Sequence, residues 1–91
     1  MNKQDRKKLT ELTGKLEDFK SQLEDLKTDL ESHRDDEQSK FENLTDGLQA
    51  AEPGQKIEQG ADKLSDAVSN MEDVVSNLED AISNITEATE L

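Results

Sequence analysis

The sequence contains no cysteine, tryptophan or tyrosine, and only one proline, one histidine and two phenylalanines. Without cysteine, the chain forms no disulfide, no zinc–thiolate site and no thiol-based catalytic centre. Its sole histidine, His33, lies in a strongly acidic stretch, and neither a glycine-rich phosphate loop nor a calcium-loop motif is present. We therefore expect a protein that is not an enzyme and that holds no metal ion or other cofactor.

Apolar residues are also scarce, since Leu, Ile, Val and Phe total 19 of 91 residues. A chain of this length forms one domain, residues 1–91, and so few apolar side chains leave it a thin core. No apolar run approaches the roughly 20 residues that span a bilayer, and residues 1–8 lack the apolar run of a secretion signal. The net charge of −12 argues against direct binding to nucleic acid or to an anionic membrane.

In the first half of the chain, apolar residues recur at alternating intervals of three and four. This spacing is typical of a helix in a coiled coil. The residues are Leu9, Leu12, Leu16, Phe19, Leu23, Leu26 and Leu30. The residues between them are mostly Lys, Glu, Gln and Asp, the majority of which favour helix. The pattern predicts a first helix over residues of about 4–46.

The second half contains three near-copies of one seven-residue unit, at residues 65–71, 72–78 and 79–85. This repeat predicts a second helix over about 55–90. Its core positions are Val68, Met71, Val75, Leu78, Ile82 and Ile85, continued backward by Ile57, Ala61 and Leu64. A further row of small apolar residues widens the stripe beyond what two helices require, which indicates an oligomer interface. This row is Ala67, Val74, Ala81 and Ala88.

The segment 47–54 contains Gly47, Pro53 and Gly54 and is expected to form the turn between the helices. Gly47 is expected to end the first helix in the left-handed conformation. A connection this short predicts antiparallel neighbours. A matching register is Leu16 beside Ile85, Phe19 beside Ile82, Leu23 beside Leu78, Leu26 beside Val75, Leu30 beside Met71 and Phe41 beside Gly60.

The predicted fold is therefore all-α: a long antiparallel helical hairpin, or coiled coil, that associates into a four-helix bundle or a higher helical oligomer. We expect a homodimer or a higher even state. Residues 1–20 hold six basic and four acidic groups, whereas no basic residue follows Lys63. The hairpin would place this basic end beside the acidic C-terminal end, an arrangement that is weakly favourable.

A polar stretch over residues 31–40 interrupts the first stripe, and apolar spacing resumes at Phe41 shifted by one position. One interpretation is a solvated gap where the helices splay; the other is a pocket for a ligand or a partner. Helix two keeps Leu64 and Val68 opposite the gap. The candidate binding residues are His33, Arg34, Glu37, Gln38, Lys40, Phe41, Gln55 and Lys56.

The segment 36–44, DEQSKFENL, is followed by Leu48-Gln49 and by 54–58, GQKIE. It resembles a pattern, Glu-Gln-x-x-Phe-[Asp/Glu]-Asn-[Leu/Met], of small acidic uncharacterised helical proteins of bacterial phages, plasmids and other mobile elements. The resemblance covers about residues 35–85; many relatives have proline where this chain has Thr45. It implies an accessory, non-catalytic protein in the cytoplasm of a bacterial host cell.

Three functions are compatible with these features. The first is a binding protein that counters a host-defence component by binding or sequestering a protein or a small nucleotide signal. The second is an acidic DNA mimic, which requires carboxylates spaced like phosphates. The third is a structural coiled-coil scaffold, which the heptads alone would support.

Overall fold

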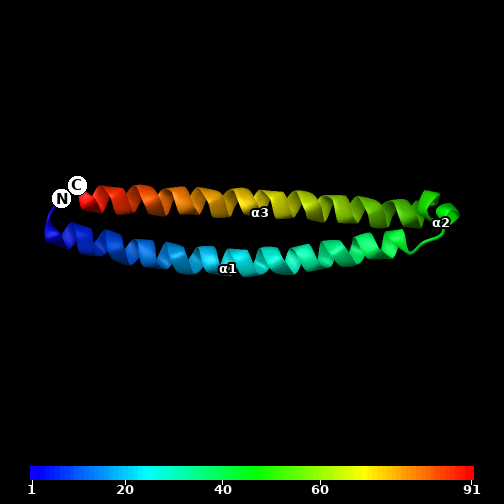
Figure 1. Cartoon of the computed structure of the whole chain (residues 1–91), viewed down its shortest axis with the longest axis horizontal. Coiled ribbons are helices and arrows are strands. Elements are labelled where there is room, and N and C mark those ends of the chain that lie inside the picture. The colour runs from blue at the N-terminus through cyan, green and yellow to red at the C-terminus, as the bar shows by residue number, and fades with distance from the viewer.

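A computed structural model describes all 91 residues and contains three helices and no strand. They are α1 (Lys3–Glu42), α2 (Asp46–Ala50) and α3 (Glu52–Glu90). Helices α1 and α3 lie side by side and antiparallel, α2 closes one end, and both termini lie at the other end (Figure 1). The chain measures 68 × 15 × 13 Å, and its radius of gyration of 20.3 Å far exceeds the roughly 12 Å of a compact domain of this length. The predicted all-helical hairpin is confirmed.

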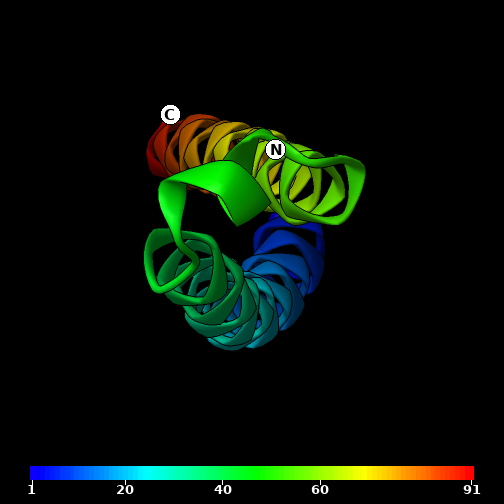
Figure 2. The same ribbon diagram turned by 90° about the vertical axis from the view of Figure 1, so that its right-hand side faces the viewer.

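The two long helices wind around one another along their length (Figure 2). A seven-residue repeat advances slightly less than two full turns of a straight helix, so helices in contact through such a repeat coil about each other. None of the helices has an apolar stretch that is long enough to cross a membrane.

The turn region is more ordered than expected. Helix α1 ends at Glu42, and Thr45 begins α2 by accepting a hydrogen bond from the Leu48 backbone N–H. Helix α3 already begins at Glu52, with Pro53 in its first turn, where its missing N–H needs no partner. The prediction that Gly47 takes a left-handed conformation is wrong: it lies inside α2, and no residue of the chain has a positive φ.

The frame of α3, meaning the set of heptad positions that face the other long helix, agrees with the heptads of the sequence. Its residues that face α1 are half-buried or buried and alternate at intervals of three and four. They are Ile57, Ala61, Leu64, Val68, Met71, Val75, Leu78, Ile82 and Ile85. Ala61 and Val68, at 2% and 3% exposure, are the only fully buried apolar residues. The predicted core positions of the second helix are therefore confirmed.

The frame of α1 differs from the prediction. Its half-buried residues include an uninterrupted alternation, which is Arg6, Leu9, Thr13, Leu16, Lys20, Leu23, Lys27, Leu30, Arg34, Glu37 and Phe41. Every second residue of the predicted stripe lies outside this row: Leu12, Phe19 and Leu26 are 48%, 49% and 54% exposed. The predicted shift of phase after residue 30 is also wrong, because the same alternation continues through the polar stretch.

The predicted pairing of side chains between the helices is wrong in several places. Phe19 is too exposed to pack against Ile82 in the core, and the same holds for the proposed pair of Leu26 and Val75. A Cβ added at Gly60 would meet nothing within 4 Å, so the Phe41 ring does not cover this glycine.

Two ion pairs across the seam between α1 and α3 define the observed register. Lys20 Nζ lies 3.7 Å from Glu79 Oε1, and Lys27 Nζ lies 3.9 Å from Glu72 Oε1. The two lysines are seven residues apart on α1, and their two glutamate partners are seven residues apart on α3. This spacing is expected for antiparallel helices that keep one heptad frame. They place each lysine level with a position of α3 two residues before the one that the predicted register required.

The open end of the hairpin joins the basic N-terminal segment to the C-terminus of α3. Arg6 Nε donates to the Thr89 carbonyl at 3.1 Å, and Arg6 Nη2 donates to the Leu91 carbonyl at 3.3 Å. A guanidinium at a helix C-terminus satisfies carbonyls that lack a helical partner and interacts favourably with the helix dipole.

Candidate protein-binding surface

One side of the hairpin carries a row of exposed and half-buried apolar residues from both long helices. On α1 the row consists of Leu12, Phe19 and Leu26, and on α3 of Ala67, Val74, Ala81 and Ala88. In an antiparallel pair of heptad helices, residues that directly precede the first core position of each heptad lie on the same side of the seam. We call these seven residues the apolar face.

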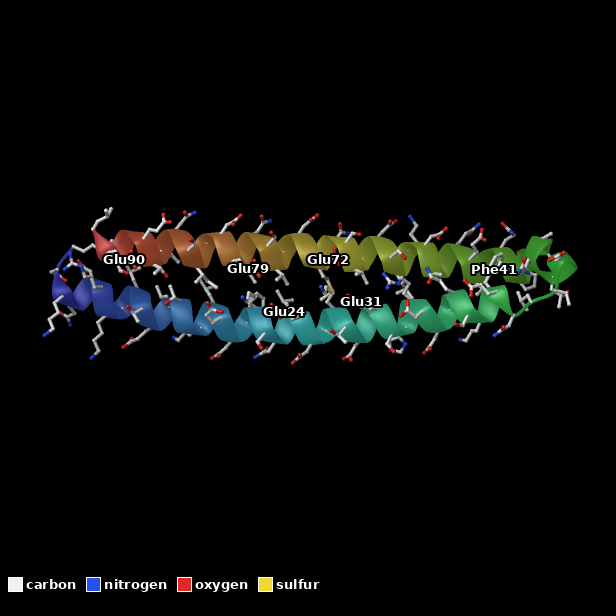
Figure 3. All side chains as sticks on the ribbon, in the orientation of Figure 1. Glu24, Glu31, Phe41, Glu72, Glu79 and Glu90 are labelled. Atoms are coloured by element: carbon white, nitrogen blue, oxygen red, sulfur yellow. The ribbon has the colours of Figure 1, made fainter.

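The other side of the seam is acidic. Lys20 lies 3.7 Å from Glu17 of its own helix as well as from Glu79, and Lys27 lies 3.7 Å from Glu31 as well as from its partner on α3. Figure 3 shows Glu24 and Glu31 of α1, and Glu72 and Glu79 of α3, along the seam. Each lysine therefore bridges one carboxylate on each helix.

This arrangement explains why α1 presents leucine and phenylalanine to solvent. Seam positions that would bury an apolar residue hold long basic side chains, whose methylene stems cover the seam while their ammonium groups reach the acidic side. Lys20 and Lys27 are 23% and 25% exposed, less than the adjacent Phe19 and Leu26. With lysine at these seam positions, Leu12, Phe19 and Leu26 lie on the side of α1 that is turned away from α3.

The apolar face ends in an open hollow of about 770 Å³ near the turn. Its lining is Leu30, His33, Asp36, Glu37, Ser39, Lys40, Gly60 and Leu64. Gly60 creates the space, because it stands in the row of small residues on α3 and has no side chain. His33 and Lys40 continue the α1 row at the same seven-residue interval as Leu26.

Three of the eight candidate binding residues, His33, Glu37 and Lys40, therefore share one hollow. Lys40 Nζ donates to Glu37 Oε1 at 2.7 Å, and this hydrogen bond, together with the charges of Glu37 and Asp36, raises the pKa of Lys40 above its usual 10.5. The charged groups of the hollow are two carboxylates, Asp36 and Glu37, and one ammonium group, Lys40.

The other candidates lie elsewhere. Gln38 and Phe41 line a different, smaller hollow with Ala61, and Lys56 lies in a third, polar one. Arg34 Nε contacts the neighbouring carboxylate of Asp35 at 3.2 Å. The eight residues do not form one pocket.

Gln55 has a structural role in the turn. Its side-chain amide donates to the Gln49 carbonyl at 2.8 Å, while the Gln49 side chain donates to the Phe41 carbonyl at 3.0 Å. These two bonds connect α2 to both long helices. Gln49 and Gln55 therefore hold the turn in place, and the side-chain amides of both residues donate hydrogen bonds within the chain.

The α1 half of the apolar face was not predicted as an interface. The signal is present in the sequence: Arg6, Thr13, Lys20, Lys27 and Arg34 recur every seven residues in phase with Phe41. With this polar row in the seam, the spacing has no phase shift, and Leu12, Phe19 and Leu26 lie outside the seam. In the row predicted as an interface on α3, Val74 is 43% exposed, whereas Ala67, Ala81 and Ala88 are half-buried.

The structure gathers no group of three or more histidine or carboxylate side chains that could hold a metal ion. No protein-family model, curated protein or solved structure matches this chain.

Proposed function

We propose that this chain is a non-catalytic binding protein that works as a homodimer, in which a second copy covers the apolar face and completes a four-helix bundle. The observation that carries the proposal is the contrast between the two sides of the hairpin. One side is a ladder of ion-paired carboxylates, whereas the other exposes Leu12, Phe19 and Leu26 beside a row of small residues. Contiguous exposed apolar surface of this kind marks an interaction site.

Surface area supports the same proposal. The hairpin exposes 6530 Å², whereas a globular monomer of its mass exposes about 5,300 Å². A stable interface covers about 800 Å² on each partner, so the excess is large enough for one. Only 3 of 91 residues are buried in the single hairpin. Dimerisation would supply the apolar core that one copy lacks.

We further propose that the dimer serves a phage or another mobile element in the cytoplasm of its bacterial host and counters a host-defence component. The sequence pattern at residues 36–44 supports this context. In the dimer, the acidic faces and the turns remain exposed, so a host protein or a small signal molecule would bind there.

The geometry favours a binding protein over a DNA mimic. Along each helix, glutamates of the acidic face recur every seven residues, about 10 Å apart, which is wider than the phosphate spacing of a nucleic-acid strand. In addition, Lys20 and Lys27 stand among these carboxylates and pair with four of them. The mimic therefore has no specific observation in its favour.

The assembly is tested by sedimentation of the wild type, Phe19→Glu and Ser21→Glu at tens of micromolar. Ser21 lies on the outer surface of the same helix, so its substitution adds the same charge away from the apolar face. We expect dimers for the wild type and Ser21→Glu, and a helical monomer for Phe19→Glu. A wild type that sediments as a monomer would overturn the dimer.

The biological role is tested by expressing the three proteins in bacterial strains that each carry one phage-defence system. We expect the wild type and Ser21→Glu to raise phage plating at least tenfold on one of these strains and to have no effect on the undefended parent. Phe19→Glu should have no effect on any strain. Unchanged plating on every strain of a broad panel would contradict the host-defence role.

A further inference from the structure

We infer that the second copy docks with its turn at the same end of the bundle, so that α1 of each copy lies against α3 of the other. This inference rests on the proposed dimer and specifies its symmetry: a twofold axis parallel to the long axis of the hairpin. Neighbouring helices would then all run antiparallel, as in an up-down-up-down bundle.

The two helices contribute side chains of very different size to the apolar face. Helix α1 contributes Leu12, Phe19 and Leu26, whereas α3 contributes alanines, with Val74 the single larger member of its row. Packing is best where large side chains meet small ones, because the layers then interdigitate without voids. A twofold axis along the hairpin brings the α1 row of each copy against the α3 row of the other.

The heights of the residues along the hairpin also match. Since Lys20 pairs with Glu79 and Lys27 pairs with Glu72, Phe19 is level with the part of α3 between Val74 and Ala81. A twofold axis parallel to the hairpin leaves these levels unchanged in the partner. The large side chains would therefore lie close to the level of smaller partner residues: Leu12 near Ala88, Phe19 near Ala81, and Leu26 near Val74.

The same axis accounts for the hollow near the turn. The α1 row continues from Leu26 to His33, and the α3 row continues from Ala67 to Gly60, next to which a Cβ would meet nothing within 4 Å. In the proposed dimer, His33 is level with Ala67 of the partner subunit, and Lys40, one heptad further along the α1 row, is level with Gly60 of the partner subunit. The absence of a side chain at residue 60 thus provides room for the long side chain of Lys40.

The opposite orientation fits less well. With the turns at opposite ends, α1 would lie against α1 and α3 against α3. The large side chains of the two α1 rows would then meet one another, while alanines would meet alanines. The α1 helices would be held apart by large side chains at the same time as the α3 helices required close approach, leaving a wedge-shaped gap that packing disfavours.

Pulsed dipolar spectroscopy between nitroxide labels tests the orientation, because a chain without cysteine accepts one label per copy. Gly47→Cys places the label in the turn, where an added side chain meets nothing within 4 Å, and Lys3→Cys places it at the open end. With turns at the same end, both variants should give distances of about 20–40 Å, set by the 8–10 Å spacing of packed helices and the label length.

With turns at opposite ends, both variants would instead give about 60 Å, the length of a 40-residue helix, and this result would overturn the inferred orientation while leaving the dimer intact. Both distances present in one sample would also contradict a single orientation. Adding Phe19→Glu to each labelled variant should abolish the dipolar signal. If the labelled variants that keep Phe19 gave no dipolar signal and had the mass of a monomer, this result would instead refute the dimer itself.

Discussion

Lys20 of α1 lies across the seam from Glu79 of α3, with 3.7 Å between Nζ and Oε1, and it contacts Glu17 of its own helix at the same distance. This lysine occupies a position in the heptad that an apolar residue usually fills. Its neighbour Phe19 consequently lies outside the seam and is half exposed. The side of α1 that bears Phe19 is thus free for a partner.

The energy of this contact should be small and sensitive to salt. In a double-mutant cycle with Lys20→Gln and Glu79→Gln, we expect a coupling energy of about 0.2–1 kcal/mol at low salt, as for other partly exposed ion pairs. At 1 M salt the coupling should largely disappear, because the screening length falls to about 3 Å. Chemical denaturation of the four proteins with urea, which adds no ions, measures it. The same coupling at both salt concentrations would contradict an electrostatic origin.

Two leucines of one helix should respond differently to truncation. Leu23 is half-buried in the seam, whereas Leu26 is 54% exposed on the apolar face. At concentrations low enough to give the monomer, Leu23→Ala should lower the free energy of unfolding by about 2 kcal/mol, and Leu26→Ala by less than about 0.5 kcal/mol.

The loss caused by Leu26→Ala should grow with protein concentration, because association adds to the stability of the wild type by mass action. Thermal or urea unfolding at two concentrations measures both effects. Equal losses for the two variants in the dilute monomer would mean that both leucines lie in the seam.

Two glycines should also give opposite results when each is replaced by alanine. A Cβ at Gly54 would overlap the Leu48 carbonyl oxygen and approach Gln49 Cα to 2.9 Å, so α2 would have to move. We expect Gly54→Ala to cost about 1–3 kcal/mol. Gly14 has open space around it, and Gly14→Ala should stabilise the helix by about 0.5–1 kcal/mol. Stabilisation by both substitutions would show that the turn packs less closely against α3.

The pKa of Lys40 should depend on Glu37. The hydrogen bond from Lys40 to Glu37 raises the pKa of this lysine above 10.5. Because the folded state holds the proton more tightly, the stabilisation is present below pH 10.5 and is lost as the pH rises through the raised pKa. In NMR titrations, Glu37→Gln should lower the pKa of Lys40 toward 10.5, whereas Glu42→Gln should leave it unchanged. An identical pKa in all three proteins would refute the contact.

The candidate site was predictable only in part, and the reason is the frame of α1. Seven apolar residues at intervals of three and four form a stripe that fits two adjacent frames, and the predicted frame is the one in which all seven face α3. The observed frame differs from it by a turn of about 50° around the helix axis, since 3.6 residues make a turn and every second seam position moves by one residue. As a result, His33 was assigned to the seam, whereas the structure places it in the row of the exposed Leu26.

The candidate binding residues near the turn were also predictable only in part. His33, Glu37 and Lys40 do lie together, because intervals of three and four place them on one side of α1. Gln55 and Lys56 come from the start of α3, whose packing against α2 depends on the close approach at Gly54. No spacing rule within one helix predicts that contact.

By itself, the sequence determined that the chain forms two long helices that fold back on one another, and it determined the frame of α3. In α3 the apolar heptads are regular and admit one reading, so the hydrophobic effect alone selects the buried side. Only the tertiary structure decided the frame of α1, the register and the side left exposed. There the apolar stripe fits two adjacent frames, and in the observed one Lys20 and Lys27 lie in the seam and reach carboxylates on α3.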